Sequence, residues 1–443
     1  MTTRFLMCLF FFCGLSVVHA QARPAPAPAS QSQALRDAAK ALAAKYDYDG
    51  ANQQLKQAYA LDKTTRLQDA ATDLTMIGEN EVRVGQDTRA LDYLQQALPL
   101  RRQVGDRKGE AQTLSDLGEA CGDLSQHDKA LAYCQQALPL RQAVQDRAGE
   151  AETLNVMGAA YVNLSQYDKA LALFQQSLAI AGQAQDRKNE AEALGGLGIT
   201  YVALNQSKQG LAYLTQALSL SKRIGDKVHE ARTLRYFGFA YGSMSQYAKA
   251  IDYHQQALLI FREVKDRAGE AVAFTNMGRA YNDLSQYAKA VDYFQRALLL
   301  FQEIKDRAGE AVTLGSLGTA YDDLSQYAKA IDYQQQALLI QREVKDRAGE
   351  ADTLNNIGAA YSFGVQCPDA CFAGSFHAIV EHEHFHSQEP QCLGSSVPYG
   401  LRVQVSAGCL QRRCRHGPSG SLLGDCPAPC DCISRNRHRL RPL

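Results

Sequence analysis

The sequence predicts an all-α protein, built as a superhelical array of antiparallel helix pairs. Two observations support this fold class. Residues recur with a fixed period of 40, and apolar residues follow helical spacing twice within each 40-residue unit. A period of this size is typical of solenoids, in which each unit buries its apolar face against its neighbours. We therefore expect one long array rather than several globular domains.

The 40-residue period is clearest at three positions of the unit. A glutamate followed by alanine, a glycine and a tyrosine each return at constant spacing. The glutamates are Glu110, Glu150, Glu190, Glu230, Glu270, Glu310 and Glu350; the glycines are Gly78, Gly118, Gly158, Gly198, Gly238, Gly278, Gly318 and Gly358; the tyrosines are Tyr161, Tyr201, Tyr241, Tyr281, Tyr321 and Tyr361.

The unit that begins at Asp266 shows the two predicted helices. From Ala271 to Leu284 the apolar residues fall three and four positions apart, which predicts a first helix with one apolar stripe. A second stripe of the same spacing runs from Tyr287 to Ile304. Asp266 is expected to cap the first helix and Ser285 the second. We interpret these apolar and capping residues as structural.

The order of residues in one unit resembles the tetratricopeptide repeat, whose helix pair carries these residue types at these offsets. The matching residues are Leu314, Leu317, Gly318, Tyr321, Ala330 and Ala337. The 40-residue variety is similar to the arrays of kinesin light chains, spindle-orientation adaptors and bacterial proteins with CHAT-type peptidase domains. The resemblance covers about residues 34–362. It implies a short leading pair, seven 40-residue units from about Leu67 to Lys345 and a final half unit.

Two departures from the repeat carry structural expectations. The first pair, from Ala34 to Leu61, is shorter and diverged, as terminal units of solenoids often are. Pro99 and Pro139 fall inside the second helices of two units. Because proline lacks a backbone N–H and its ring clashes with the preceding turn, we expect those helices to end early or kink.

The N-terminal residues 1–20 are predicted to be a signal peptide. Arg4 precedes an apolar run from Phe5 to Val18, and small residues at Val18 and Ala20 suit cleavage after Ala20. Cys13 also invites a lipoprotein interpretation, but bulky residues precede it. Residues 21–33 form a predicted Ala/Pro linker. We expect an exported protein, periplasmic or secreted, without stable membrane insertion after cleavage.

The tail, residues 363–443, departs abruptly from the repeat. It contains eight Cys, six His and eight Arg, but no Lys. Three interpretations are open: a frameshifted translation product, a disordered appendage, or a small metal or disulfide module. The sequence favours them in that order, since the candidate ligand spacings fit no familiar zinc pattern. The candidate ligands are Cys367, Cys371, His382, His384, His386, Cys426, Cys430 and Cys432.

Composition and motifs argue for binding rather than catalysis. The chain has 47 basic and 47 acidic residues, so it lacks the one-signed field of a general nucleic-acid binder. The array contains no recognisable catalytic motif, and we expect no enzyme activity, cofactor or metal. Cys121 and Cys134 in one unit are interpreted either as a disulfide between the two helices or as small core residues.

The tetratricopeptide resemblance implies a concave groove lined by the first helix of each pair, and a protein or peptide ligand within it. Arginine beside aromatic residues, flanked by an amide, is typical of a peptide hot spot, although a solvated face is the simpler interpretation. The sequence does not predict the oligomeric state. Two alternative functions are the sensing arm of a CHAT-type peptidase and a self-assembling structural solenoid. The candidate groove residues are Arg232, Arg235, Tyr236, Phe239, Asn276, Arg279, Asn282 and Asn155.

Overall fold

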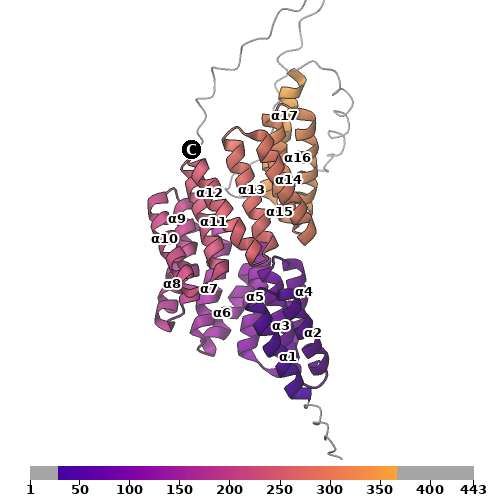
Figure 1. Ribbon diagram of the computed structural model, residues 1–443, viewed down its shortest axis with the longest axis vertical. Coiled ribbons are helices and arrows are strands. Elements are labelled where there is room, and N and C mark those ends of the chain that lie inside the picture. The colour runs from indigo at the N-terminus through magenta and orange to yellow at the C-terminus, as the bar shows by residue number, and fades with distance from the viewer. Residues whose placement is uncertain (1–27, 367–443) are drawn as a thin grey trace, which may run out of the picture. The chain divides into compact units, whose positions relative to one another are not determined.

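A computed structural model describes residues 28–366, and these residues form seventeen α-helices and no strand (Figure 1). The helices alternate between first and second members of antiparallel pairs. The first helices are α1 (Pro28–Ala43), α3 (Leu67–Arg83), α5 (Arg107–Asp123), α7 (Arg147–Asn163), α9 (Arg187–Ala203), α11 (Lys227–Ser243), α13 (Arg267–Asp283), α15 (Arg307–Asp323) and α17 (Arg347–Gln366). The second helices are α2 (Tyr48–Asp62), α4 (Asp87–Val104), α6 (His127–Ala143), α8 (Tyr167–Ala184), α10 (Ser207–Ile224), α12 (Tyr247–Glu263), α14 (Tyr287–Ile304) and α16 (Tyr327–Val344). The predicted fold class is confirmed.

The repeated glycine sets the distance between the two helices of a pair. A Cβ atom on Gly278 of α13 would lie 2.6 Å from Cε1 of Phe294 of α14, and Phe294 is itself fully buried. The same contact recurs in the other pairs, because each repeated glycine from Gly78 to Gly318 lies beneath one second-helix side chain. Those side chains are Leu94, Cys134, Phe174, Leu214, His254, Phe294 and Gln334. The glycine is therefore required for close packing.

The cap prediction is confirmed for Asp266 and wrong for Ser285. The side chain of Asp266 accepts a hydrogen bond from the backbone N–H of Gly269. Ser285, in contrast, has a φ of 57°, and its backbone N–H donates to the carbonyl of Asn282. It therefore closes the end of the first helix, and Gln286 stands at the N-cap of α14 without a side-chain cap.

Three other expectations about helix ends are corrected. Helices α4 and α6 do not end early at Pro99 and Pro139, because losing one N–H leaves the other helical hydrogen bonds and the packed face intact. Helix α1 begins at Pro28, so residues 28–33 of the predicted linker are helical; proline suits a first helical position. Helix α17 continues to Gln366, beyond the predicted end of the array near Ser362.

The superhelix brings distant units into contact. The backbone N–H of Arg267, at the start of α13, donates to the carbonyl of Val84, which follows α3, at 3.3 Å. Gly85 beside it has a φ of 73°, and a Cβ there would lie 2.4 Å from the Cβ of Ala268. Glycine is thus needed at residue 85 both for its backbone conformation and for this close approach.

Candidate ligand-binding surface

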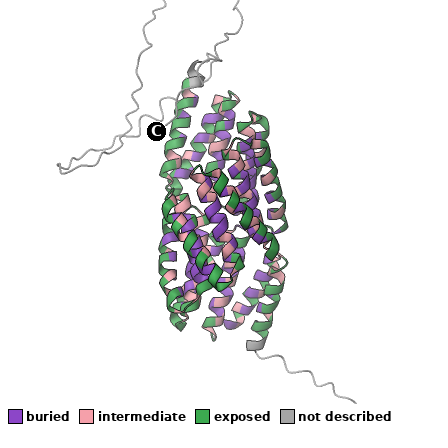
Figure 2. Cartoon of the chain, turned by 90° about the vertical axis from the view of Figure 1, so that its left-hand side faces the viewer, coloured by how far each residue is buried: buried purple, intermediate pink, exposed green. Residues whose placement is uncertain are grey.

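The first helices line the inner, concave side of the array. Successive first helices from α3 to α17 pack on one another, whereas within residues 28–366 successive second helices make no comparably extensive contact. Buried residues lie on the sides of the helices that face each other (Figure 2). We call the solvent-accessible face of the first helices the inner surface. Each unit contributes four residue positions to this surface, and in α11 they are residues 232, 236, 239 and 243.

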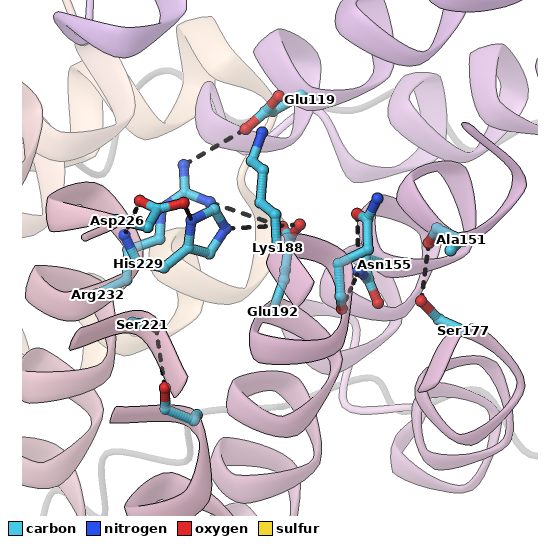
Figure 3. Close-up of polar contacts among 12 residues, drawn as sticks. Glu119, Ala151, Asn155, Ser177, Lys188, Glu192, Ser221, Asp226, His229 and Arg232 are labelled. Carbon is cyan, nitrogen blue, oxygen red and sulfur yellow. Dashed lines mark hydrogen bonds and ion pairs between the residues drawn. The ribbon is translucent and has the colours of Figure 1, made fainter. Parts of the chain in front are cut away.

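Arg232 connects opposite parts of the inner surface. Its Nη2 lies 3.4 Å from Oε1 of Glu119 on α5, and its Nη1 lies 3.8 Å from Oε1 of Glu192 on α9 (Figure 3). Burial would lower the pKa of the guanidinium, but the surrounding carboxylates, Glu119 first among them, raise it. Arg232 therefore remains charged within a surface whose side chains come from three different helices.

His229 continues this charged network. Its buried ring lies 2.8 Å from Oδ2 of Asp226 through Nδ1 and 3.6 Å from Oε2 of Glu192 through Nε2. Burial opposes its charge, but the hydrogen bond to Asp226 and the nearby carboxylate of Glu192 raise the pKa of His229. Burial likewise opposes ionisation of Glu192, yet contact with His229 and Arg232 lowers its pKa to about 2. The basic and acidic groups of this network therefore stabilise one another's charged forms.

The predicted arginine and aromatic residues of α11 do lie together. The Arg235 guanidinium carbon lies 4.9 Å from the centroid of the Tyr236 ring, a cation–π distance. Tyr236 also faces Gly195 of α9, where an added Cβ would lie 3.8 Å from its ring. Phe239 is 50% exposed, which is unusual for phenylalanine at the middle of a packed helix.

The remaining predicted residues divide into two groups. On α13, Asn276 is half-buried and Arg279 is exposed, and both occupy inner-surface positions next to α11. Asn282 instead donates from Nδ2 to Oδ2 of Asp323 on α15 at 2.8 Å. Asn155 is 1% exposed and donates to the backbone carbonyl of Asn189 at 3.2 Å, so it joins α7 to α9 and does not face the groove.

Glu192 and His229 are not among the predicted site residues, and the pairing of Glu119 with Arg232 was not predicted. The 40-residue offset offered a signal, since residues 112, 152, 192 and 232 occupy one inner-surface position and change from glutamine to glutamate to arginine. His229, by contrast, departs from the glycine or asparagine that precedes the repeated glutamate in most other units. Changes of polar residue at one position of successive 40-residue units therefore indicate the inner surface.

Cys121 and Cys134 are both buried free thiols in one apolar cluster. Burial raises the pKa of Cys121 to about 11 and raises that of Cys134 further. Cys134 occupies the second-helix position above the repeated glycine, here Gly118. Its packing matches the interpretation as a core residue.

Among the residues that the structure describes, no group of three or more His, Cys, Asp or Glu side chains is arranged to hold a metal ion. No helix there is long and apolar enough to cross a membrane. The predicted signal peptide and the Cys/His ligands of the tail lie outside the described residues.

An array of antiparallel helix pairs with a charged and aromatic inner surface defines a helical solenoid of the protein-binding class. A family model for the tetratricopeptide repeat matches six stretches, residues 68–143, 149–223, 189–263, 229–303, 269–343 and 310–370. The chain therefore belongs to the tetratricopeptide repeat family. Members of this family are generally non-catalytic scaffolds, and no catalytic family is indicated.

Solved structures with the same fold share little sequence with this chain. A Rap protein complexed with Competence and Sporulation Factor has a TM-score of 0.50 at 15% identity, covering 76% of this chain and 100% of that one. The Rap conjugation gene regulator of plasmid pLS20, in complex with the Phr* peptide, has a TM-score of 0.52 at 13% identity, covering 61% and 73%. TPR-like repeats of a putative kinesin light chain from Podospora anserina have a TM-score of 0.35 at 16% identity, covering 45% and 97%. A sequence search of curated proteins finds no match.

Proposed function

We propose that this protein binds a peptide, or an extended segment of another protein, along the inner surface formed by α11 and α13. The observation that carries the proposal is the group of half-buried Arg235 and Tyr236 and exposed Phe239 on one helix, with exposed Arg279 on the next. Phe239 offers apolar area that no part of the described chain covers. Arginine and tyrosine are the residue types that contribute most to binding energy at such surfaces.

The location of this group favours an extended ligand. Successive first helices present equivalent positions at regular intervals, so a peptide can contact several units at once. Half-buried Asn276 on α13 offers an amide able to pair with peptide backbone groups. The pLS20 regulator, which has the same fold, was solved in complex with a peptide. We further propose, from the predicted signal peptide alone, that binding takes place outside the cytoplasm.

A peptide-capture experiment tests the proposed site. The purified chain is exposed to a synthetic hexapeptide library, and captured sequences are measured individually by isothermal titration calorimetry. We expect Tyr236→Ala and Phe239→Ala each to weaken binding by about 2 kcal/mol or more, with the circular dichroism spectrum unchanged. Arg296→Ala on the second helix α14 is the matched control and should bind normally. Unchanged affinity in both α11 variants would place the site elsewhere.

Self-assembly is the second candidate function, and one observation favours it. Leu259, Leu299 and Leu339 occupy the same position of α12, α14 and α16 and are 67%, 67% and 71% exposed. Such a row of apolar residues is unusual on a monomer surface. Sedimentation velocity across a hundredfold range of protein concentration, without any peptide, distinguishes self-assembly from peptide binding. Assembly that grows with concentration and disappears in Leu299→Glu would support this candidate.

A further inference from the structure

Four carboxylates from three first helices occupy positions of the inner surface. They are Glu79 of α3, Asp116 and Glu119 of α5, and Glu152 of α7. Asp116 and Glu152 are linked through Gln112, which donates to Asp116 at 2.8 Å and accepts from Arg141, and Arg141 contacts Glu152 at 3.2 Å. Burial first, and then the charges of Glu79, Glu152 and Glu119, raise the pKa of Asp116, so these carboxylates repel its ionised form. Repulsion of this kind is unfavourable in the unliganded protein.

Asp116 is the least satisfied member of the group. Its side chain is buried, with the residue 6% exposed. Oδ1 accepts a hydrogen bond from Nε2 of Gln112 at 2.8 Å, but Oδ2 has no partner. A buried carboxylate oxygen without a partner is costly, and such groups in native proteins call for an explanation. The repeat does not require a carboxylate at this position, because the equivalent residues of other units include Met76, Val156 and Asn276.

The cations around the group are already engaged. Arg141 contacts Asp146, Gln112 and Glu152, the last at 3.2 Å. Arg232 contacts Glu119 and Glu192. Burial raises the pKa of Glu79, and the charges of Arg83, Lys188 and Arg101 oppose that rise. Lys188 also acts on Glu152, but none of these cations hydrogen-bonds Asp116 within the described residues. Burial, the largest influence, nevertheless raises the pKa of Glu152 to about 7.

A metal ion does not fit this group, because the described carboxylates are not arranged to share one. An organic cation fits better, since an ammonium or guanidinium group donates several hydrogen bonds to oxygens that lie further apart. The group also lies on the same inner surface as the α11 site, because Glu119 contacts Arg232 directly. A peptide in that site can therefore extend to it.

We propose that Glu79, Asp116 and Glu152 form a pocket for a cationic group of the bound peptide, either a Lys or Arg side chain or a free N-terminal ammonium. This inference rests on the proposed function and adds the class of ligand. Asp116 Oδ2 then gains the charged hydrogen-bond donor that it lacks, and the repulsion among the carboxylates is relieved. Because burial raises the pKa of Glu152 to about 7, binding of the cation favours its ionised form and releases protons.

The test uses three matched hexapeptide libraries and the full chain. The first library is N-acetylated and contains Lys and Arg; the second has free N-termini and neither residue; the third is N-acetylated and contains neither. We expect the chain to enrich the first or the second about thirtyfold over the third, since removing one partner from a buried charged pair costs about 2 kcal/mol or more. Which library is enriched identifies the source of the cation.

The double variant Asp116→Asn/Glu152→Gln is the critical comparison. It should lose the enrichment while binding peptides of the third library as the wild type does, and it should no longer release protons in calorimetry repeated in two buffers of different ionisation enthalpy. Glu303 is an exposed carboxylate of α14, and the control variant Glu303→Gln should retain both the enrichment and the proton release. Capture without any preference for a cation, or a preference that survives the double variant, overturns the pocket and leaves the proposed function standing. Capture of no peptide at all overturns both.

Discussion

Arg232 of α11 and Glu119 of α5 are 113 residues apart in sequence, yet Nη2 and Oε1 lie 3.4 Å apart. The contact shows that the inner surface is shared between units that are not neighbours in the array. Side chains from α5, α9 and α11 therefore lie together on this surface.

A double-mutant cycle measures this contact. Glu119→Gln and Arg232→Gln are expected to couple by about 0.2–1 kcal/mol in urea unfolding, because both side chains are roughly one-third exposed. The coupling should weaken at high salt. Pairing Glu119→Gln with Arg279→Gln instead should give additive effects. A coupling of zero for the first pair would mean that α5 and α11 do not meet in solution.

The repeated glycines should respond to substitution according to their surroundings. Gly278→Leu forces a side chain against Phe294, and we expect a loss of about 1–3 kcal/mol or more. Gly182→Ala, in α8, meets no atom within 4 Å and should stabilise by about 0.5–1 kcal/mol through helix propensity. Arg279→Ala should change stability by less than about 0.5 kcal/mol. Thermal unfolding measures the ranking of the three variants by stability. Equal changes in Tm for Gly278→Leu and Arg279→Ala would show that the inner and packed faces are reversed.

We expect the variant Glu152→Gln to be more stable than the wild type by an amount that depends on pH. Burial raises the pKa of Glu152 to about 7 from an ordinary value of 4.5, so the folded protein binds a proton that the unfolded chain has released. The contribution of Glu152 to the free energy of unfolding therefore falls as the pH rises from about 4.5 to about 7. The glutamine variant should match the wild type at pH 4 and exceed it at pH 8 by about 1–2 kcal/mol. A constant difference at all pH values would contradict this origin.

Export is checked at the N-terminus. Because an apolar run and a Val-x-Ala site precede Gln21, the exported protein should begin at Gln21. Edman sequencing of protein recovered outside the cytoplasm measures this. A sequence starting at Met1, or a lipidated Cys13, would contradict the prediction.

The local structure of the array could be predicted from the sequence because it depends on short-range physics. The glycine at 278 and the aspartate at 266 each fulfil one role within a single unit, and repetition makes that role visible. Ser285 was misjudged because the same residue type suits a helix start and, here, a left-handed helix end. Pro99 was misjudged because packing along α4 outweighs the loss of one hydrogen bond.

The candidate site could be predicted only in part. The grouping of Arg235, Tyr236 and Phe239 follows from spacing on one helix. Their relation to Glu119, and the burial of Asn155 between α7 and α9, depend on small angles between successive units that accumulate along the array. A single sequence does not specify those angles, so contacts across the superhelix became apparent only with the structure.

Site-specific photo-crosslinking tests the central claim most directly, because it asks which face of the array the peptide touches. Benzoylphenylalanine is placed either at Phe239, 50% exposed on the inner surface, or at Leu299, 67% exposed on α14. Both positions are accessible and apolar, so they differ mainly in the face they report. With a captured peptide bound, we predict a crosslink from residue 239 and none from residue 299. A crosslink from residue 299 alone would contradict peptide binding on the inner surface.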